Sequence, residues 1–417
     1  MKNAFRLSAL FLACAGAYST AQAADIQMFG FFDQGISYLH EDLNAGMGGP
    51  AGQSLSNPAG IDPATGHVER QGTKSQLAQG TGNVSTWGIR GSEQLNDDVK
   101  FIFHLENGFL ADSGEFYIAN RLFERESSAG LDSKTFGQIK FGRMPALTTG
   151  SGTTGIFNSR VNPFGAGWGN MTGGWKFVGT LATARYDNMI NYISPKFGGL
   201  QFHAQYSFKN NSTAAGEEGS SDADRWWAIG ATLTGEKYFL AAAVDCVDYG
   251  HRVPTSAAGS QADSMPEKEA YKFLIGGHYN FDAFKLYGAA QYMKNVPWIG
   301  GYSTKEVAPM LSSDISPVGE PGSVKQRGFD AWALSTGVDF KQWGGTVKLS
   351  VGYAQAENQN ISDNNDMQRA NVGLGYVYPL SKRTSIYGIA GAFWQDADWQ
   401  EDDITAHEAI VGLMHRF

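Results

Sequence analysis

The sequence predicts an all-β fold, a 16-stranded antiparallel transmembrane β-barrel, and three observations support this prediction. The last residues, 405–417, place a mostly apolar set and a partly charged set of side chains at alternate positions, as expected for a strand with two different faces. They end on an aromatic residue, Phe417, which carries the terminal carboxylate. Short alternating segments of the same kind recur from end to end, joined in turn by tight turns and long polar loops. No run of about eighteen apolar residues follows residue 23, so helical membrane spans are excluded.

The composition agrees with this fold class. Mean hydropathy is −0.29, which suits a barrel because only one side chain in two faces lipid. The chain holds 53 Gly, 26 Phe, 17 Tyr and 10 Trp residues, the glycine and aromatic content of a large β protein. No Pro/Ser-rich linker divides it, so we expect residues 24–417 to form one barrel domain.

The first residues, 1–23, have the pattern of a secretory signal peptide: Lys2 and Arg6, a short apolar stretch, and Ala21-Gln22-Ala23 as a cleavage site. Removing them takes away two of 32 basic residues and none of 41 acidic ones, so the mature net charge is 30 − 41 = −11. This balance argues against nucleic acid as a partner. Only Cys246 remains, so we expect no intrachain disulfide, no metal site and no cofactor.

The predicted strands form an orderly series of hairpins. A single strand at 26–39 precedes a loop of more than forty residues, and a single strand at 405–417 ends the chain. Between them lie seven strand pairs with short turns: 85–92 with 99–110, 124–131 with 137–143, 189–194 with 200–208, 225–233 with 239–249, 269–279 with 284–293, 328–340 with 345–356, and 368–377 with 384–395. Short turns on one side and long loops on the other are the layout of a membrane barrel.

Two other β architectures fit the sequence less well than the barrel does. A sandwich rarely carries seven alternations of tight turn and long loop, and a propeller should repeat every 40–45 residues or so. The chain shows no such repeat. A barrel of sixteen strands leaves an aqueous channel, whereas side chains fill the interior of a barrel of eight strands. The fold class therefore predicts a pore.

Several motifs, in order along nearly the whole mature chain, carry a family resemblance. They lie at 85–95 (STWGIRGSEQL), 105–109 (LENGF), 121–125 (RLFER), 136–143 (FGQIKFGR), 185–188 (RYDN), 194–195 (SP), 197–199 (FGG) and 412–417 (GLMHRF). With these segments the chain resembles the general trimeric porins of Gram-negative bacteria, in their β-proteobacterial form.

The resemblance implies a homotrimer in the outer membrane, in contact with its lipid and lipopolysaccharide, with short periplasmic turns and long extracellular loops. It implies diffusion of small hydrophilic solutes and a third loop folded into the lumen. Residues 144–186 hold the place of that constriction loop, and 162–165 look like its tip. The segment 107–120 is the one that the resemblance implies as a latch onto a neighbouring subunit. Apolar residues of 144–186 would also expose too much surface if the loop pointed outward.

The resemblance further implies a ladder of basic residues on the pore wall. We expect Arg90, Arg125 and Arg143 on the lumen face, with Ile89, Trp87 and Phe141 on the lipid side. Arg160 adds a basic residue to the constriction loop. Thr86 and Asn191 stand where related sequences commonly have basic residues, so the ladder is thinner.

The constriction loop contains no Asp or Glu, so the usual acids across the lumen are missing. Anion preference is therefore expected despite the acidic net charge. The acids gather mainly in predicted outer loops: Glu217, Glu218, Asp222, Asp224, Asp363, Asp366, Glu401, Asp402 and Asp403. Residues 363–366 offer oxygen ligands for a divalent cation, but they lack the full spacing of a calcium loop, so solvated charge is the preferred interpretation.

The aromatic residues of the constriction loop, Phe164, Trp168, Trp175 and Phe177, leave an alternative open. They could stack on aromatic acids or sugars and make the pore substrate-selective, although anchoring of the loop to the wall is favoured. A barrel adhesin is a further alternative. No nucleophile is marked near a histidine, and no phosphate loop or zinc spacing occurs, so an enzyme is not expected.

The end of the chain closes the predicted barrel. Alternation points Arg416 to the lumen and Phe417 to the lipid edge. The last strand must pair with 26–39, because an unpaired edge cannot persist in hydrocarbon. The terminal aromatic of Phe417 also fits the assembly signal that the resemblance implies.

Overall fold

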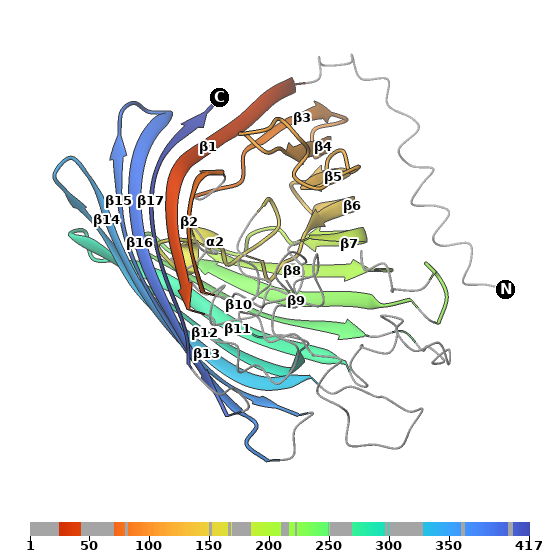
Figure 1. Ribbon diagram of the computed structural model, residues 1–417. Helices are drawn as coiled ribbons and strands as arrows, with labels where there is room; N and C mark the ends of the chain where they lie inside the picture. The colour runs from red at the N-terminus through yellow and green to blue at the C-terminus, as the bar shows by residue number, and fades with distance from the viewer. Residues whose placement is uncertain are drawn as a thin grey trace.

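The computed structural model shows a large barrel of antiparallel strands, with the first and last strands side by side (Figure 1). It describes residues 25–42, 71–79, 82–149, 152–165, 168, 185–209, 217–221, 223–248, 250, 269–296, 299, 328–359, 363–398 and 403–417. The predicted signal peptide, residues 1–23, and the loop residues Trp175 and Phe177 lie outside this part. Among the described residues no helix has the length and apolar character to cross a bilayer.

All the pairings are antiparallel: β2 and β3 both pair with β1, from β3 onward each strand pairs with the next along the chain, and β1 pairs with β17 to close the sheet. The strands are β1 (Asp25–Asp42), β2 (Gln71–Gln79), β3 (Thr86–Gln94), β4 (Val99–Gly108), β5 (Glu126–Ser133), β6 (Gly137–Pro145), β7 (Arg185–Ile193), β8 (Leu200–Ser207), β9 (Arg225–Thr234), β10 (Tyr238–Asp248), β11 (Ala270–Asn280), β12 (Phe284–Val296), β13 (Phe329–Gln342), β14 (Gly345–Asn358), β15 (Asp366–Pro379), β16 (Thr384–Ala397) and β17 (Ile404–Arg416).

The seventeen strands occupy sixteen positions around the barrel, as predicted. β2 pairs with Gln34–Asp42 of β1, and β3 pairs with Asp25–Phe31, so the two follow one another along the same edge. The prediction of one loop of more than forty residues after the first strand was therefore wrong. Residues 71–79 are mostly polar and lack aromatic side chains, so their strand character depends on pairing with β1.

The break between β2 and β3 is held by a buried carboxylate on the inner face of β1. Asp33 Oδ2 accepts hydrogen bonds from the backbone N–H groups of Gly82 and Asn83, both at 2.7 Å. The hydroxyl of Tyr387 donates to the other oxygen at 2.6 Å. Because a buried carboxylate is stable only when its lone pairs are satisfied, this cluster fixes the interrupted strand to the closing seam.

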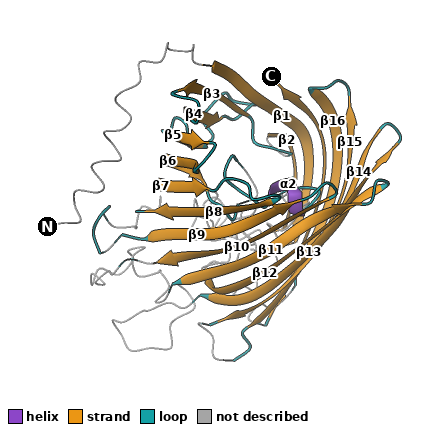
Figure 2. Cartoon of the chain, turned by 180° about the vertical axis from the view of Figure 1, so that it is seen from behind, coloured by secondary structure: helices purple, strands orange, loops and turns teal. Residues whose placement is uncertain are grey.

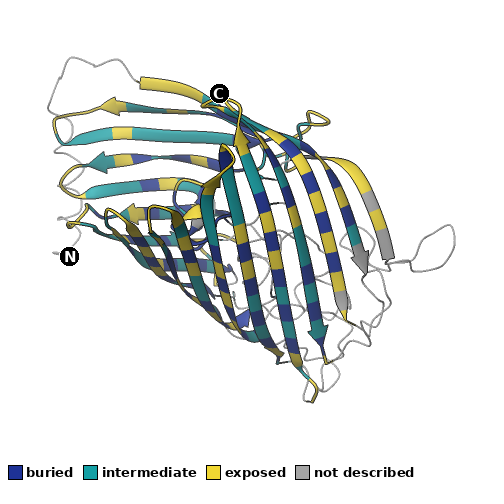
Figure 3. Cartoon of the chain, turned by 90° about the vertical axis from the view of Figure 1, so that its left-hand side faces the viewer, coloured by how far each residue is buried: buried dark blue, intermediate teal, exposed yellow. Residues whose placement is uncertain are grey.

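Side chains alternate between a small, buried inner face and a large, exposed outer face. In β13, Ala331 and Ala333 are 5% and 3% exposed, whereas Trp332 and Leu334 are 39% and 52% exposed. Figure 3 shows the same banding along the strands. Large apolar residues pointing away from the interior are what a lipid-facing wall requires. The main buried apolar cluster instead joins the inner wall to the segment after β6, with Met144, Leu147 and Phe157 among its members.

The C-terminal residue completes the closing seam. The backbone N–H groups of Gly30 and Phe417 each donate to the other's carbonyl oxygen at 3.1 Å, and Phe31 lies opposite Arg416. A Cβ atom placed on Gly30 would lie 2.1 Å from Cζ of Phe417. The Phe417 ring thus covers Gly30 on the outer face, and the predicted pairing and face of the last strand are confirmed.

We expect Gly30→Val to displace the Phe417 ring and to lower the yield of folded barrel, because the new side chain occupies the ring's position. The matched control is Gly288→Val, since a Cβ on Gly288 meets nothing within 4 Å. Refolding into detergent micelles, followed by the gel mobility of folded and unfolded chains, measures the yield. Equal yields for the two variants would contradict the role assigned to the packing of the Phe417 ring over Gly30.

Candidate functional site

The described part of the third loop, residues 146–149, 152–165 and 168, runs inside the barrel. It contains the short helix α2 (Asn158–Val161), which Figure 2 shows within the ring of strands. Just after the helix, the Asn162 amide nitrogen donates to Ser335 Oγ at 3.0 Å and to Ser350 Oγ at 2.9 Å. Both serines lie on the inner faces of β13 and β14. The loop therefore folds into the lumen, as predicted, and residues 162–165 dock on the wall opposite its origin.

The start of the loop is tied to the near wall by a buried ion pair. Lys140 Nζ lies 2.8 Å from Glu126 Oε1, and the two side chains are 7% and 0% exposed. Thr153 of the loop donates to Glu126 Oε2 at 2.6 Å and accepts from Lys140 at 3.1 Å. Leu147 N donates to Gln205 Oε1 at 2.6 Å. These contacts hold the first part of the loop against the near wall.

The aromatic residues described at the loop tip pack against the wall. Phe164 is 1% exposed and its ring meets that of Trp168 edge-on, with centroids 5.8 Å apart. Trp168 in turn meets Tyr387 edge-on at 5.5 Å, and Lys348 Nζ lies 5.5 Å from its ring centroid. The surfaces of Phe164 and Trp168 are therefore largely used in anchoring the loop.

Two of the predicted wall arginines point into the lumen. Arg90 lies opposite Gln27 on β1 and donates to its Oε1 from Nε at 3.0 Å and from a terminal nitrogen at 2.8 Å. Arg125 is 7% exposed, and its Nε lies 3.1 Å from Glu106 Oε1. Glu106 thus neutralises Arg125. Arg90, in contrast, has no ion-pair partner among the described residues.

Arg143 faces the outside of the barrel, so its predicted place in the ladder was wrong. It lies opposite Ser127 in the register of β5 and β6, two residues from the outward Phe141, and residues two apart on a strand share a face. Its guanidinium contacts Asp187 Oδ1 at 2.6 Å. Lys140, one residue before Phe141, is the inward cation of this strand.

The segment after β4 covers this part of the outer wall. The ring of Phe123 meets the outward Trp87 edge-on with centroids 6.1 Å apart. The Phe123 N–H donates to Asn107 Oδ1 at 3.2 Å. Arg121 also contacts Asp187, at 3.0 Å. Residues 109–125 thus shield Arg143 and its ion pair from the surroundings, which explains why the Arg143 side chain is only 10% exposed.

Arg160 lies in a different sector from the arginines of β3 to β5. Its guanidinium sits over the Phe239 ring, 4.7 Å from the centroid, and its carbonyl oxygen accepts from His278 Nδ1 at 2.8 Å. Phe239 and His278 belong to β10 and β11. The predicted set Arg90, Arg125, Arg143 and Arg160 is therefore not one cluster.

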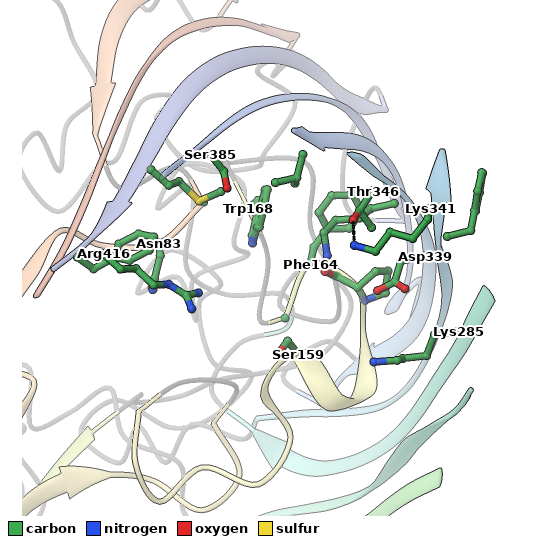
Figure 4. A pocket seen from close by; sticks show the side chains of 18 of the residues that line it. Asn83, Ser159, Phe164, Trp168, Lys285, Asp339, Lys341, Thr346, Ser385 and Arg416 are labelled. Atoms are coloured by element: carbon green, nitrogen blue, oxygen red, sulfur yellow. Dashed lines mark hydrogen bonds between the residues drawn. The ribbon is translucent and has the colours of Figure 1, made fainter. Parts of the chain in front are cut away.

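Basic residues line a lumen cavity of about 830 Å³ between the tip of the third loop and the short-turn end of the barrel. Figure 4 shows Arg416 and Asn83 on one side of it, Lys285, Asp339 and Lys341 on the other, and Phe164 and Trp168 between. Seven basic residues line the cavity: Arg125, Lys285, Lys341, Lys348, Lys382, Arg383 and Arg416.

The acids of the same lining are mostly neutralised. Glu106 is paired with Arg125, and Asp282 with Lys237 at 2.7 Å. Asp339 accepts a hydrogen bond from the Tyr287 hydroxyl at 2.7 Å. Apart from Arg125, none of the basic lining residues has an ion pair with a described residue. Six cations thus face one remaining carboxylate, an uncompensated charge of 6 − 1 = +5.

Of the seven basic lining residues, reasoning from the sequence identified only Arg125 and Arg416 as facing the lumen and missed the other five. Alternation assigns each lysine a face, but it does not say which inward residues from distant strands share one cavity. Within the described part of the chain, no group of three or more His, Cys, Asp or Glu side chains could hold a metal ion.

A closed barrel with a loop-narrowed, charged lumen defines a membrane channel. Residues 8–398 match the Gram-negative porin family, and the chain belongs to that family. It is 29% identical to an outer membrane porin protein of Bordetella pertussis over 100% of both chains. It is 27% identical to outer membrane porin protein 32 of Delftia acidovorans, over 92% of this chain and 87% of that one. The protein is an outer-membrane porin.

Solved structures show the same fold. An anion-selective porin from Comamonas acidovorans has a TM-score of 0.60 at 19% identity, covering 95% of this chain and 100% of that one. The outer membrane channel DcaP of Acinetobacter baumannii has a TM-score of 0.57 at 14% identity, covering 97% and 100%.

Proposed function

We propose that this porin is a diffusion channel for small hydrophilic solutes that prefers anions. One observation carries the proposal: six lumen cations share a cavity with a single uncompensated carboxylate. The absence of acids from the constriction loop supports it, because the loop offers no counter-charge across the lumen. The proposal also agrees with the anion selectivity named for the Comamonas porin.

The expected size of the preference follows from Coulomb's law. An anion about 7 Å from one lumen cation gains roughly 0.6 kcal/mol in water and about 2.4 kcal/mol at an effective dielectric constant of 20. This corresponds to a preference of roughly threefold to sixtyfold per unscreened charge. Salt reduces it, since the Debye length is about 10 Å at 0.1 M ionic strength.

The reversal potential of the purified porin in planar bilayers under a KCl gradient tests the proposal. We expect a potential whose sign corresponds to chloride as the more permeant ion, and a preference that weakens as the KCl concentration rises. Swelling of sucrose-loaded liposomes tests whether the protein is a pore. A pore lets small solutes pass without converting them chemically, whereas an adhesin or an enzyme need not let them pass at all. A clear potassium preference would overturn the proposed anion selectivity.

The proposed assembly is a homotrimer joined through the outer wall that residues 109–125 cover. Phe116, Ile118 and Leu122 of this segment are 45%, 41% and 53% exposed, and the Arg143–Asp187 ion pair lies beneath it. Exposing a polar outer wall to hydrocarbon costs free energy. We therefore expect a neighbouring copy of the chain, and not lipid, to cover this surface. Cross-linking in micelles should give a trimer that Leu122→Glu weakens; an unchanged trimer would count against this interface.

A further inference from the structure

The closing seam brings together two histidines from opposite ends of the sequence. His40 of β1 lies directly opposite His407 of β17, and the two strands run side by side (Figure 1). Directly opposed side chains share one face of a sheet, which here is the outer face that also carries Tyr38, 42% exposed. The sequence predicts no metal site because only Cys246 follows the predicted signal peptide, but strand pairing creates a pair of imidazoles instead.

Most ring nitrogens of this pair make no other contact. His40 Nδ1 lies 3.0 Å from Thr73 Oγ1, across the pairing of β1 with β2. Within the part of the chain that the structure describes, His40 Nε2 and both ring nitrogens of His407 have no hydrogen-bond partner. A metal-binding histidine usually makes a hydrogen bond through one ring nitrogen and coordinates the ion through the other. Thr73 therefore orients the His40 ring with Nε2 left for a ligand.

The separation of the two rings matches that of two imidazoles on one metal ion. With metal–nitrogen bonds of about 2.0–2.1 Å and a tetrahedral angle at the ion, the centroids of two ligating rings lie about 5 Å apart. The centroids of His40 and His407 are 5.0 Å apart, with 38° between the ring planes. His407 is exposed, and its ring can turn about a terminal side-chain torsion with a broad energy profile. Water completes the coordination, because the two side chains supply two ligands.

The pair lies where a hydrated ion can reach it. Gly30, under the Phe417 ring, is near the short-turn end of the seam, and His40 is 40 − 30 = 10 residues further along β1. Ten residues of strand at about 3.3 Å each, tilted by about 40°, rise roughly 25 Å, which is the height of the apolar band of a membrane barrel. His40 and His407 thus lie at the long-loop edge of that band, next to water.

We propose that His40 and His407 form a binding site for one divalent transition-metal ion of the zinc, nickel or copper class, which clamps the first strand to the last. Imidazole nitrogen suits these ions, whereas Mg²⁺ and Ca²⁺ prefer oxygen ligands. The two ligands meet only when β1 and β17 are paired, so the ion binds the closed barrel better than the unfolded chain. A ligand with this preference stabilises the folded state. The site lies on the outer wall and does not depend on the proposed anion preference of the lumen.

Zinc titration of the purified porin in detergent micelles at pH 7.5 or so tests the proposal. Calorimetry should find one Zn²⁺ per chain. At a Zn²⁺ concentration about ten times the dissociation constant, the ratio of folded to unfolded chain at the denaturant midpoint should rise roughly tenfold. EDTA should reverse this effect, and Mg²⁺ or Ca²⁺ should not reproduce it. His40→Gln and His407→Gln should each abolish it.

Two further variants separate a metal site from a pair of rings that only pack together. His415→Gln removes a histidine of the same strand whose partner across the seam is Phe32, so zinc should stabilise this variant as it does the parent. Thr73→Val removes the hydrogen bond to His40 and keeps both ligands, so the zinc dissociation constant should rise roughly tenfold.

The outcomes decide the proposal without reference to ion selectivity. A parent that zinc does not stabilise, or a zinc effect that persists in both His40→Gln and His407→Gln, would overturn the site. Equal stabilisation by Mg²⁺ and Zn²⁺ would show that imidazole nitrogens are not the ligands, which also overturns it. Unchanged zinc affinity in Thr73→Val would overturn the positioning role of Thr73.

Discussion

Inverting three lumen cations together, with Lys285→Glu, Lys341→Glu and Arg416→Glu, is expected to convert the pore to cation preference. The uncompensated charge of the cavity lining changes by six, from +5 to −1. Each charge contributes roughly 0.6–2.4 kcal/mol to an ion about 7 Å away, so several inversions outweigh the original preference. The reversal potential under a KCl gradient should change sign.

A variant that removes the three charges without inverting them is the control. The neutral variant Lys285→Gln, Lys341→Gln and Arg416→Gln leaves the lining at +2 and should retain a weakened chloride preference. All three side chains are partly or fully exposed to the lumen, so the substitutions are expected to leave the barrel folded. A glutamate variant with the parent's reversal potential would mean that other residues set the selectivity.

Lys140→Met should destabilise the barrel by about 3–5 kcal/mol, the usual cost of leaving one member of a buried ion pair alone. Glu126, which is 0% exposed, then keeps only the hydroxyl donors of Thr153 and Ser128. The tether between the third loop and the wall weakens at the same time, so we also expect noisier open-channel current. The denaturant midpoint of unfolding in micelles measures the stability change.

The double variant Lys140→Met/Glu126→Gln is the matched comparison. It removes both charges, so no buried carboxylate is left without a cation, and most of the stability should return. If the single variant is as stable as the double one, water or another donor must satisfy Glu126. The role of the Lys140–Glu126 pair in holding the loop would then be wrong.

The outward orientation of Arg143 shows how alternation must be applied. Side-chain alternation places residues 141 and 143 on one face, so the reasoning that identifies Phe141 as lipid-facing also excludes Arg143 from the lumen. It places Lys140 on the lumen face instead. For Arg90 and Ile89, which are adjacent, alternation assigned opposite faces and the pairing with β1 agrees.

The barrel, its sixteen positions and its closure through 405–417 follow from local patterns, because a strand with one lipid-facing side must alternate and a membrane leaves no edge unpaired. The absence of acids from the third loop is likewise a property of the amino-acid order alone. The pairing of residues 71–79 with β1, the outer cover over Arg143 and the meeting of six cations in one cavity depend on contacts between segments far apart in the chain. Such contacts arise from register and loop docking, which local side-chain patterns do not encode.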